Sequence, residues 1–458
     1  MNDIIAFFAF LKYCLGYKEN MSRVIAGMDW QELCSFASKQ ALLGLCFEGI
    51  ERLGEEYPEE LKRNPIGREL LMTWMGKAQQ IRRQNMKVNA VASKLFAMLR
   101  EDGLRCCILK GQGNALMYPN PYSRTPGDID VGVNASREDI TEYAKCHFKL
   151  EDDIRLQHLE TSLDGVPVEL HFFPCSMNNP IYHVRLQKWF LRNADLQCSN
   201  IVGLPDGAGD IAIPTSPFNV VYQLTHLYHH FFDEGIGMRQ IIDYFLVVND
   251  FSKNVFLNND LSNHPVNFSN HPVPLSKEGS TFSPSPSSSG SGDVTAPSRC
   301  SEPLRSKDGG PSKVSPDCAG WDRLAIEGDN SAGSTTVVTF SASTALVVVQ
   351  RELKHLGLWK FAGAVMYVQH EALGLSEEKM IAPMDEKRGK LLLAEILNGG
   401  NFGQHFTKYG HFTQQGMAKK YFLKIWRNMH FVRYFPAEAL SEPIFRTWHF
   451  FWRLKHRR

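Results

Sequence analysis

Two aspartates separated by one residue, Asp128 and Asp130, lie in the stretch GDIDVGV. On a β-strand their side chains project from the same face, because successive side chains alternate. A third acidic residue, Glu169, lies in the apolar stretch VPVELHFF. Carboxylates gathered on one sheet face repel one another unless cations neutralise them, and oxygen ligands suit Mg²⁺. The three residues therefore predict a magnesium site of the kind that supports phosphoryl transfer.

The residues around these carboxylates are candidates for holding phosphate groups. Lys110 and Gly111 follow the apolar run LRCCIL and precede residues that fit a short helix, whose backbone N–H groups would face phosphate oxygens. Gly111 lets the backbone approach a nucleotide closely, and Arg124 carries a planar fork that matches a phosphate. A D-x-D pair alone is most often a solvated turn or an edge strand. Here the pair is accompanied by Glu169 on another predicted strand and by the Gly111 turn after a third. This combination favours a functional site.

The elements that must position these residues alternate between strands and helices. Apolar runs predict strands over 104–109, 129–133, 158–163 and 166–173, with a helix opening at Ser136. Helical spacing of apolar residues dominates before and after this α/β stretch. The expected organisation is a helical region over 1–103, an α/β domain over 104–200, a helical region over 201–250, a disordered insertion over 251–345 and a C-terminal helical region over 346–458.

The predicted insertion is crowded with Ser, Pro and Gly, as in FSPSPSSSGSGD. Such a segment buries too little apolar surface to offset its ordering entropy. The stretch TTVVTFSASTALVVVQ near its end fits either a strand pair or an apolar run without regular structure.

Composition bounds the partners and the compartment. A formal net charge of +1 over 458 residues predicts no broad attraction to nucleic acid. The basic, aromatic C-terminus is better explained by a solvated helix than by contact with RNA. The ten cysteines include no CxxC pair, which argues against structural zinc. Without a signal peptide or an apolar run of roughly 18 residues, the expected location is cytoplasmic, with no membrane partner.

The motifs LKG, LMYPNPYSR, GDIDVGV and VELHFF resemble the uncharacterised bacterial nucleotidyltransferase family of the DNA polymerase beta-like superfamily. The resemblance covers about residues 104–175 and implies an α+β fold, with a small mixed-sheet domain flanked by helical segments. It implies transfer of a nucleoside monophosphate from a nucleoside triphosphate, with ATP as the expected substrate, to a hydroxyl on a protein, an RNA or a small molecule. Pyrophosphate would be released, and Mg²⁺ or Mn²⁺ would be the cofactor.

The resemblance also implies roles for individual residues. Asp128, Asp130 and Glu169 match the metal-binding and catalytic carboxylates. The residues expected to border the nucleotide are Lys110, Gly111, Gln112, Arg124, His171, His226, His230, Arg239 and Asp243.

Two alternatives remain open. Gln112 stands where the superfamily has a serine, which removes a hydroxyl that would contact phosphate. In the first alternative, the loss of this hydroxyl abolishes catalysis, and the chain is a catalytically inactive nucleotide-binding or interaction protein that retains the fold. His226 and His230, four residues apart, share one helical face and are candidates for a hydrolytic transition-metal site, although packing of that helix against the α/β domain is favoured. Neither a Walker P-loop nor HExxH occurs.

Overall fold

The computed structural model describes residues 2–150, 155–260, 342–405 and 417–456. The chain divides into one unit formed by Met1–Phe256 and Thr339–Arg458, and a second unit, Leu257–Val338. Most of the second unit lies outside the described residues, as does most of the insertion predicted over 251–345. The sheet and all the candidate site residues belong to the first unit.

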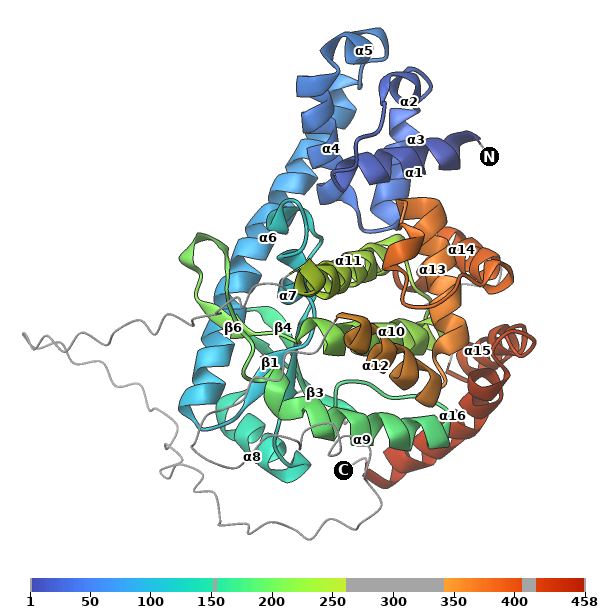
Figure 1. Ribbon diagram of the computed structural model, residues 1–458. Coiled ribbons are helices and arrows are strands. Elements are labelled where there is room, and N and C mark those ends of the chain that lie inside the picture. The colour runs from blue at the N-terminus through green and yellow to red at the C-terminus, as the bar shows by residue number, and fades with distance from the viewer. Residues whose placement is uncertain (1, 151–154, 261–341, 406–416, 457–458) are drawn as a thin grey trace, which may run out of the picture. The chain divides into compact units, whose positions relative to one another are not determined.

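Residues 2–101 are helical, as their apolar spacing predicts. The side chain of Asp29 accepts hydrogen bonds from the backbone N–H groups of Gln31 and Glu32, which caps the N-terminus of the helix that begins at Trp30. Helix α6 (Arg68–Glu101) buries its C-terminal half against the sheet (Figure 1). These helices are α1 (Asn2–Cys14), α2 (Ser22–Ala26), α3 (Trp30–Lys39), α4 (Leu43–Glu56), α5 (Pro58–Arg63) and α6 (Arg68–Glu101).

The four predicted strands form one mixed sheet, which confirms the predicted α+β class. The strand order is β1-β2-β4-β3, with β2 and β4 parallel and the two outer pairs antiparallel. The strands are β1 (Cys106–Ile108), β2 (Ile129–Val133), β3 (His158–Leu163) and β4 (Val166–His171). The short helix α7 (Gln112–Ala115) lies between β1 and β2, and α8 (Arg137–His147) follows β2.

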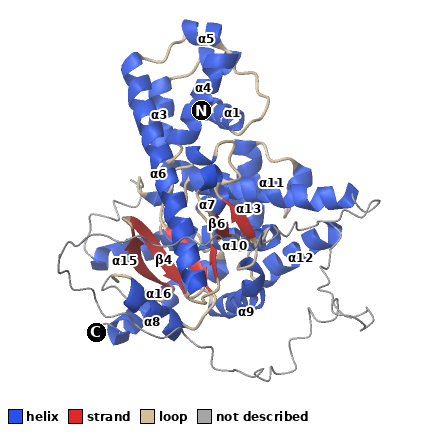
Figure 2. Ribbon diagram, turned by 90° about the vertical axis from the view of Figure 1, so that its left-hand side faces the viewer, coloured by secondary structure: helices blue, strands red, loops and turns tan. Residues whose placement is uncertain are grey.

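Alternation along the strands gives the sheet two chemically different faces. Apolar side chains such as Ile129 and Val131 of β2 share one buried core with residues of α6 and α8. Figure 2 shows the sheet together with these two helices. Asp130 lies between them in the sequence and therefore faces the other side. On that other side, the register pairs Asp130 with Glu169 and Gly132 with His171. Helices α6 and α8 thus cover the apolar face, and the acidic face borders a cavity whose walls include residues of α10 (Ser216–Asp233) and α11 (Met238–Asp260).

The predicted helical region over 201–250 begins later than expected. After α9 (Pro180–Gln197), residues Ile201–Gly203 and Asp210–Ala212 form an antiparallel hairpin, β5 and β6. Ile211 and Ala212 of β6 join the core beneath the sheet. Strands of three residues are too short to show a period-2 pattern in the sequence. Helical structure then resumes with α10 (Ser216–Asp233) and α11 (Met238–Asp260).

Both ends of the predicted insertion are helical where the structure describes them. Helix α11 continues to Asp260, and α12 begins at Ala342. The part of TTVVTFSASTALVVVQ that is described is therefore a helix and not a strand pair. The remaining helices are α12 (Ala342–His355), α13 (Trp359–Leu373), α14 (Glu386–Gly399), α15 (Met417–Met429) and α16 (Pro436–His456).

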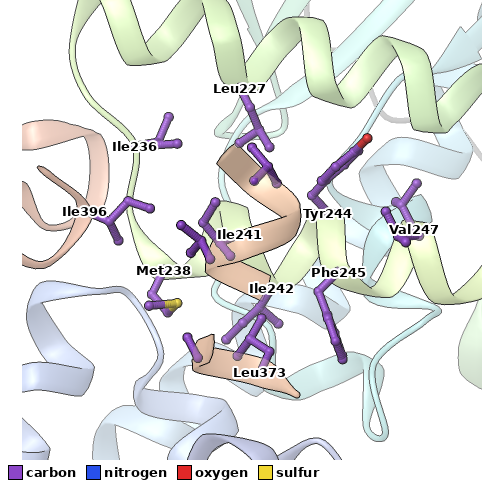
Figure 3. Close-up of a cluster of buried hydrophobic side chains, with 14 of the residues drawn as sticks. Leu227, Ile236, Met238, Ile241, Ile242, Tyr244, Phe245, Val247, Leu373 and Ile396 are labelled. Atoms are coloured by element: carbon purple, nitrogen blue, oxygen red, sulfur yellow. The ribbon is translucent and has the colours of Figure 1, made fainter. Parts of the chain in front are cut away.

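Apolar packing fixes the start of α11, which borders the candidate site. Figure 3 shows Met238, Ile241 and Ile242 of α11 with Leu373 of α13 and Ile396 of α14 around them. All five side chains are fully buried. Helices α13 and α14 thereby hold the first turn of α11 in place. None of the helices within the described ranges combines the length and the hydropathy that crossing a membrane requires.

Candidate functional site

Three carboxylates converge on the face of the sheet opposite α6 and α8. Asp128 immediately precedes β2, Asp130 lies on β2, and Glu169 lies opposite it on β4. One ligand oxygen from each residue lies within 4.8 Å of the others. Asp130 is only 2% exposed, and its Oδ2 atom has no hydrogen-bond partner. A buried oxygen without a partner is costly unless something else binds it, so the three residues fit a divalent cation held by oxygen ligands.

Two basic side chains balance the charge of this cluster. The Lys110 Nζ atom lies 3.2 Å from Asp130 Oδ1. His171 Nε2 lies 3.1 Å from Asp130 Oδ1 and 3.1 Å from Glu169 Oε2. Lys110 and His171, which were expected to border the nucleotide, thus contact the carboxylates directly.

The pKa values of the cluster follow from these contacts. Burial favours the neutral form of Asp130, but the charges of Lys110 and His171 prevail and lower the pKa of its carboxyl. Burial likewise opposes protonation of His171, yet its hydrogen bonds to the carboxylates of Asp130 and Glu169 raise the pKa of its ring to about 9. At neutral pH, His171 therefore donates its Nε2 proton to two ionised carboxylates.

A chain of nitrogen contacts leads from Lys110 into α10. Lys110 Nζ lies 2.9 Å from His226 Nε2, which lies 3.1 Å from His230 Nε2. Burial and the charge of Lys110 lower the pKa of His226 well below its ordinary value, so its neutral ring accepts a hydrogen bond from the ammonium group. In the described part of the chain, both groups of three metal-capable side chains come from the sheet and the residue just before β2, and neither includes a residue of α10.

Gly111 and Gln112 are neighbours in the sequence, but only Gly111 lines the cavity described below. Gly111 has φ of +67°, a conformation that favours glycine. Gln112 is buried, donates a hydrogen bond to Asn89 of α6 and does not line that cavity. The long side chain of Gln112 reaches the helix beneath it, and its expected contact with the nucleotide stays a prediction.

Arg124 and Asp243 form a buried bidentate ion pair. The Arg124 Nε and Nη2 atoms each lie 2.8 Å from an oxygen of Asp243. Tyr118 Oη donates to the same carboxylate at 2.8 Å. The fork of Arg124 is thus occupied by a protein carboxylate. The structure brings these two predicted residues together as partners of each other, and the expected contact of Arg124 with a phosphate stays a prediction.

Arg239, one turn before Asp243 on α11, differs from Arg124 because it has no carboxylate partner among the described residues. Its Nη1 atom donates to the Thr125 carbonyl at 3.0 Å, while its buried Nε has no hydrogen-bond partner. It forms no salt bridge with any residue in the described ranges, and its guanidinium lies 5.6 Å from the centre of the Phe402 ring. Arg239 therefore offers a positive charge and a free donor for an anionic group.

These residues line one cavity of about 760 Å³, which is large enough for a nucleotide. Of the predicted site residues, only Gln112 is absent from its walls. The predicted residues in the walls are Lys110, Gly111, Arg124, Asp128, Asp130, Glu169, His171, His226, His230, Arg239 and Asp243.

The cavity residues that were not predicted include His158, Gln240, Asn401 and Phe402. His158 is paired with His171 in the antiparallel register of β3 and β4, a signal that a hairpin prediction could have used. Asn401 and Phe402 form the short 3-10 helix η5 (Asn401–Gly403). Nothing in the glycine-rich sequence NGGNFGQ indicates that it reaches a site more than 150 residues away in the chain.

Comparison with known proteins gives one match. Residues 26–262 match the family described as uncharacterised nucleotidyltransferase. No curated protein and no solved structure matches the chain. The matched residues cover just over half of the chain and include the whole sheet and all the residues predicted for the site. The chain therefore belongs to this nucleotidyltransferase family and is an enzyme of that kind.

Proposed function

We propose that the protein moves a nucleoside monophosphate from a nucleoside triphosphate onto a hydroxyl acceptor, with Mg²⁺ or Mn²⁺ held by Asp128, Asp130 and Glu169. The observation that carries this proposal is the convergence of the three carboxylates in the wall of a nucleotide-sized cavity, with Asp130 Oδ2 buried and unbonded. A cation bound there neutralises phosphate charge that three carboxylates would otherwise repel.

The protein's own residues account for the rest of the reaction. The acceptor oxygen bonds to the α-phosphorus, the bond between that phosphorus and the bridging oxygen breaks, and pyrophosphate leaves. Glu169 is partly exposed in the cavity and is placed to take the acceptor's proton. Arg239 supplies charge for the phosphates, and Gly111 permits their close approach. ATP is the nucleotide that we expect first, and the acceptor is a protein, RNA or small-molecule hydroxyl.

The reaction class is tested with two labels. The purified full-length protein is incubated with Mg²⁺, a cell extract as the source of acceptors, and ATP labelled at either the α- or the γ-phosphate. Nucleotidyl transfer puts the α-label on an acceptor and releases the γ-label as pyrophosphate. Transfer of the γ-label to an acceptor would instead identify a kinase and contradict the proposal. Nucleotide binding without any turnover would favour the inactive alternative.

A further inference from the structure

A second group of potential metal ligands lies beside the carboxylates. His158 of β3 and His171 of β4 are directly opposite each other in the antiparallel register, with ring centres 5.0 Å apart. One ligand atom each from His158, Glu169 and His171 lies within 4.8 Å of the others. Glu169 is thus common to this group and to the carboxylate group with Asp128 and Asp130.

Both histidines approach the same oxygen. His158 Nδ1 lies 3.4 Å and His171 Nε2 lies 3.1 Å from Glu169 Oε2. The two nitrogens and the oxygen therefore surround one point in the wall of the cavity, which all three residues line. Adjacent strands of a sheet hold them there, so little rearrangement is needed for a single ion to contact them all.

His158 has unused binding capacity. Both of its ring nitrogens are buried and lack a hydrogen-bond partner. Its Nε2 atom lies 3.5 Å from Glu160 Oε1, but neither this contact nor the one to Glu169 has the geometry of a hydrogen bond. Buried polar atoms are almost always bonded, so the unbonded Nδ1 atom, which faces Glu169 Oε2, points to a ligand.

We infer that His158, His171 and Glu169 form a second cation site that takes a transition metal such as Mn²⁺, Co²⁺ or Zn²⁺. Two imidazoles with one carboxylate are typical ligands of transition metals, whereas Mg²⁺ prefers oxygen ligands. Asp130 keeps Lys110 as its partner when His171 turns to this ion. The shared Glu169 places this cation next to the one held by the carboxylates.

The test uses Co²⁺ as the probe, because nitrogen ligands change its visible absorption. The full-length protein is stripped of metal and titrated with Co²⁺ in excess Mg²⁺, with calorimetry in parallel. The wild type is expected to bind Co²⁺ with a nitrogen-ligand absorption band. His158→Ala is expected to lose that band and to bind Co²⁺ at least about tenfold more weakly. His147→Ala, which removes an imidazole from α8 outside the cavity, is the matched control and should match the wild type.

Folding of each variant is verified by circular dichroism, and His158→Gln is made in parallel because it keeps a polar side chain of similar size. Co²⁺ binding in His158→Ala or His158→Gln that equals the wild type in affinity and spectrum overturns the inference. The proposed nucleotidyl transfer is measured separately. A Co²⁺ band without transfer would contradict only the proposed function, and transfer with unchanged Co²⁺ binding in the His158 variants would contradict only this site.

Discussion

At the scale of single residues, Asp130 illustrates how the chain keeps a buried carboxylate charged. Its Oδ1 atom contacts Lys110 and His171, whereas its Oδ2 atom has no partner. The positive charges of Lys110 and His171 offset part of the free-energy cost of burying the Asp130 carboxylate. The Oδ2 atom stays available to a metal ion. Without a bound metal ion, Lys110 therefore compensates the charge of Asp130. The sequence alone suggested phosphate binding for Lys110 and did not indicate this role.

Replacing Lys110 tests this role. Lys110→Met leaves the buried Asp130 carboxylate with less compensation, so the free energy of unfolding without divalent cations should fall by about 3 kcal/mol. Mg²⁺ should restore part of the loss. Lys94→Met is the control, because Lys94 pairs with Asp164 on the surface, where an ion pair contributes about 1 kcal/mol or less. Denaturant unfolding with and without Mg²⁺ measures both variants, and equal losses would show that Lys110 does not compensate a buried charge.

Arg239 is the residue to which we assign phosphate binding. Arg239→Met removes a charge that has no salt bridge among the described residues, so the KM for the nucleoside triphosphate should rise about tenfold or more. Stability should change little, because no buried carboxylate loses its ion pair. Steady-state kinetics at saturating Mg²⁺ gives the result. An unchanged KM would contradict the assignment.

At the scale of elements, the pair Arg124–Asp243 joins the loop before β2 to helix α11. This loop ends at Asp128, so the ion pair fixes the approach of the chain to the carboxylates. Tyr118 bonds the same aspartate and adds the segment after α7 to the junction. The pair is a structural connection between the sheet and the helix that carries Arg239.

Breaking that pair should unfold the protein more readily. Arg124→Met leaves Asp243 buried without its partner, and the free energy of unfolding should fall by about 3–5 kcal/mol. Arg105→Met is the matched control, since Arg105 pairs with Asp195 on the surface, and should cost about 1 kcal/mol or less. Thermal and denaturant unfolding compare the two. If Arg124→Met is as stable as its control and only the KM rises, Arg124 binds substrate after all.

The sheet could be predicted from the sequence because its strands carry clear patterns. The apolar run around Cys106 and the alternation around Asp130 and Glu169 give the strands, and the same alternation places both carboxylates on one face. The hairpin of β5 and β6 escaped prediction because each strand has only three residues. The role of Arg124 also escaped, because an arginine beside a D-x-D pair looks the same in the sequence whether its partner is a phosphate or Asp243.

At the scale of the whole molecule, part of the cavity wall comes from residues beyond the segment that matches the family. Phe402 of η5 lies next to Arg239 and His230, although the family match ends at residue 262. Gly237 makes this contact possible, because a Cβ atom there would lie 2.7 Å from the Asn401 Cα atom. Such long-range packing depends on the complete fold, and no local pattern in the sequence could indicate it.

The C-terminal helix α16 also connects to the sheet domain, through a buried carboxylate. Glu438 accepts hydrogen bonds from the backbone N–H groups of Asn178 and Asn179, just before α9. Burial nevertheless raises the pKa of Glu438 to about 7. Because the folded protein then holds a proton that the unfolded chain releases near pH 4.5, this group makes the protein less stable as the pH rises from about 4.5 to about 7.

Glu438→Gln should remove this pH dependence. Relative to its value at pH 5, the free energy of unfolding at pH 8 should be about 1–3 kcal/mol higher in the variant than in the wild type. Glu386→Gln, at an exposed position on α14, serves as the control and should follow the wild type. Denaturant unfolding at both pH values is the measurement. Parallel pH profiles for the wild type and Glu438→Gln would show that Glu438 does not titrate with folding.

The most direct measurement of the central claim is the transfer of an α-labelled nucleoside monophosphate by the wild type, Asp130→Asn and Glu160→Gln. Glu160 is paired with Glu169 in the register of β3 and β4 but does not belong to the carboxylate group with Asp128 and Asp130. Asp130→Asn removes one charged ligand of the cation and should reduce the rate at least about 100-fold, while Glu160→Gln should stay within a few-fold of the wild type. Transfer that proceeds equally in all three proteins would contradict the account.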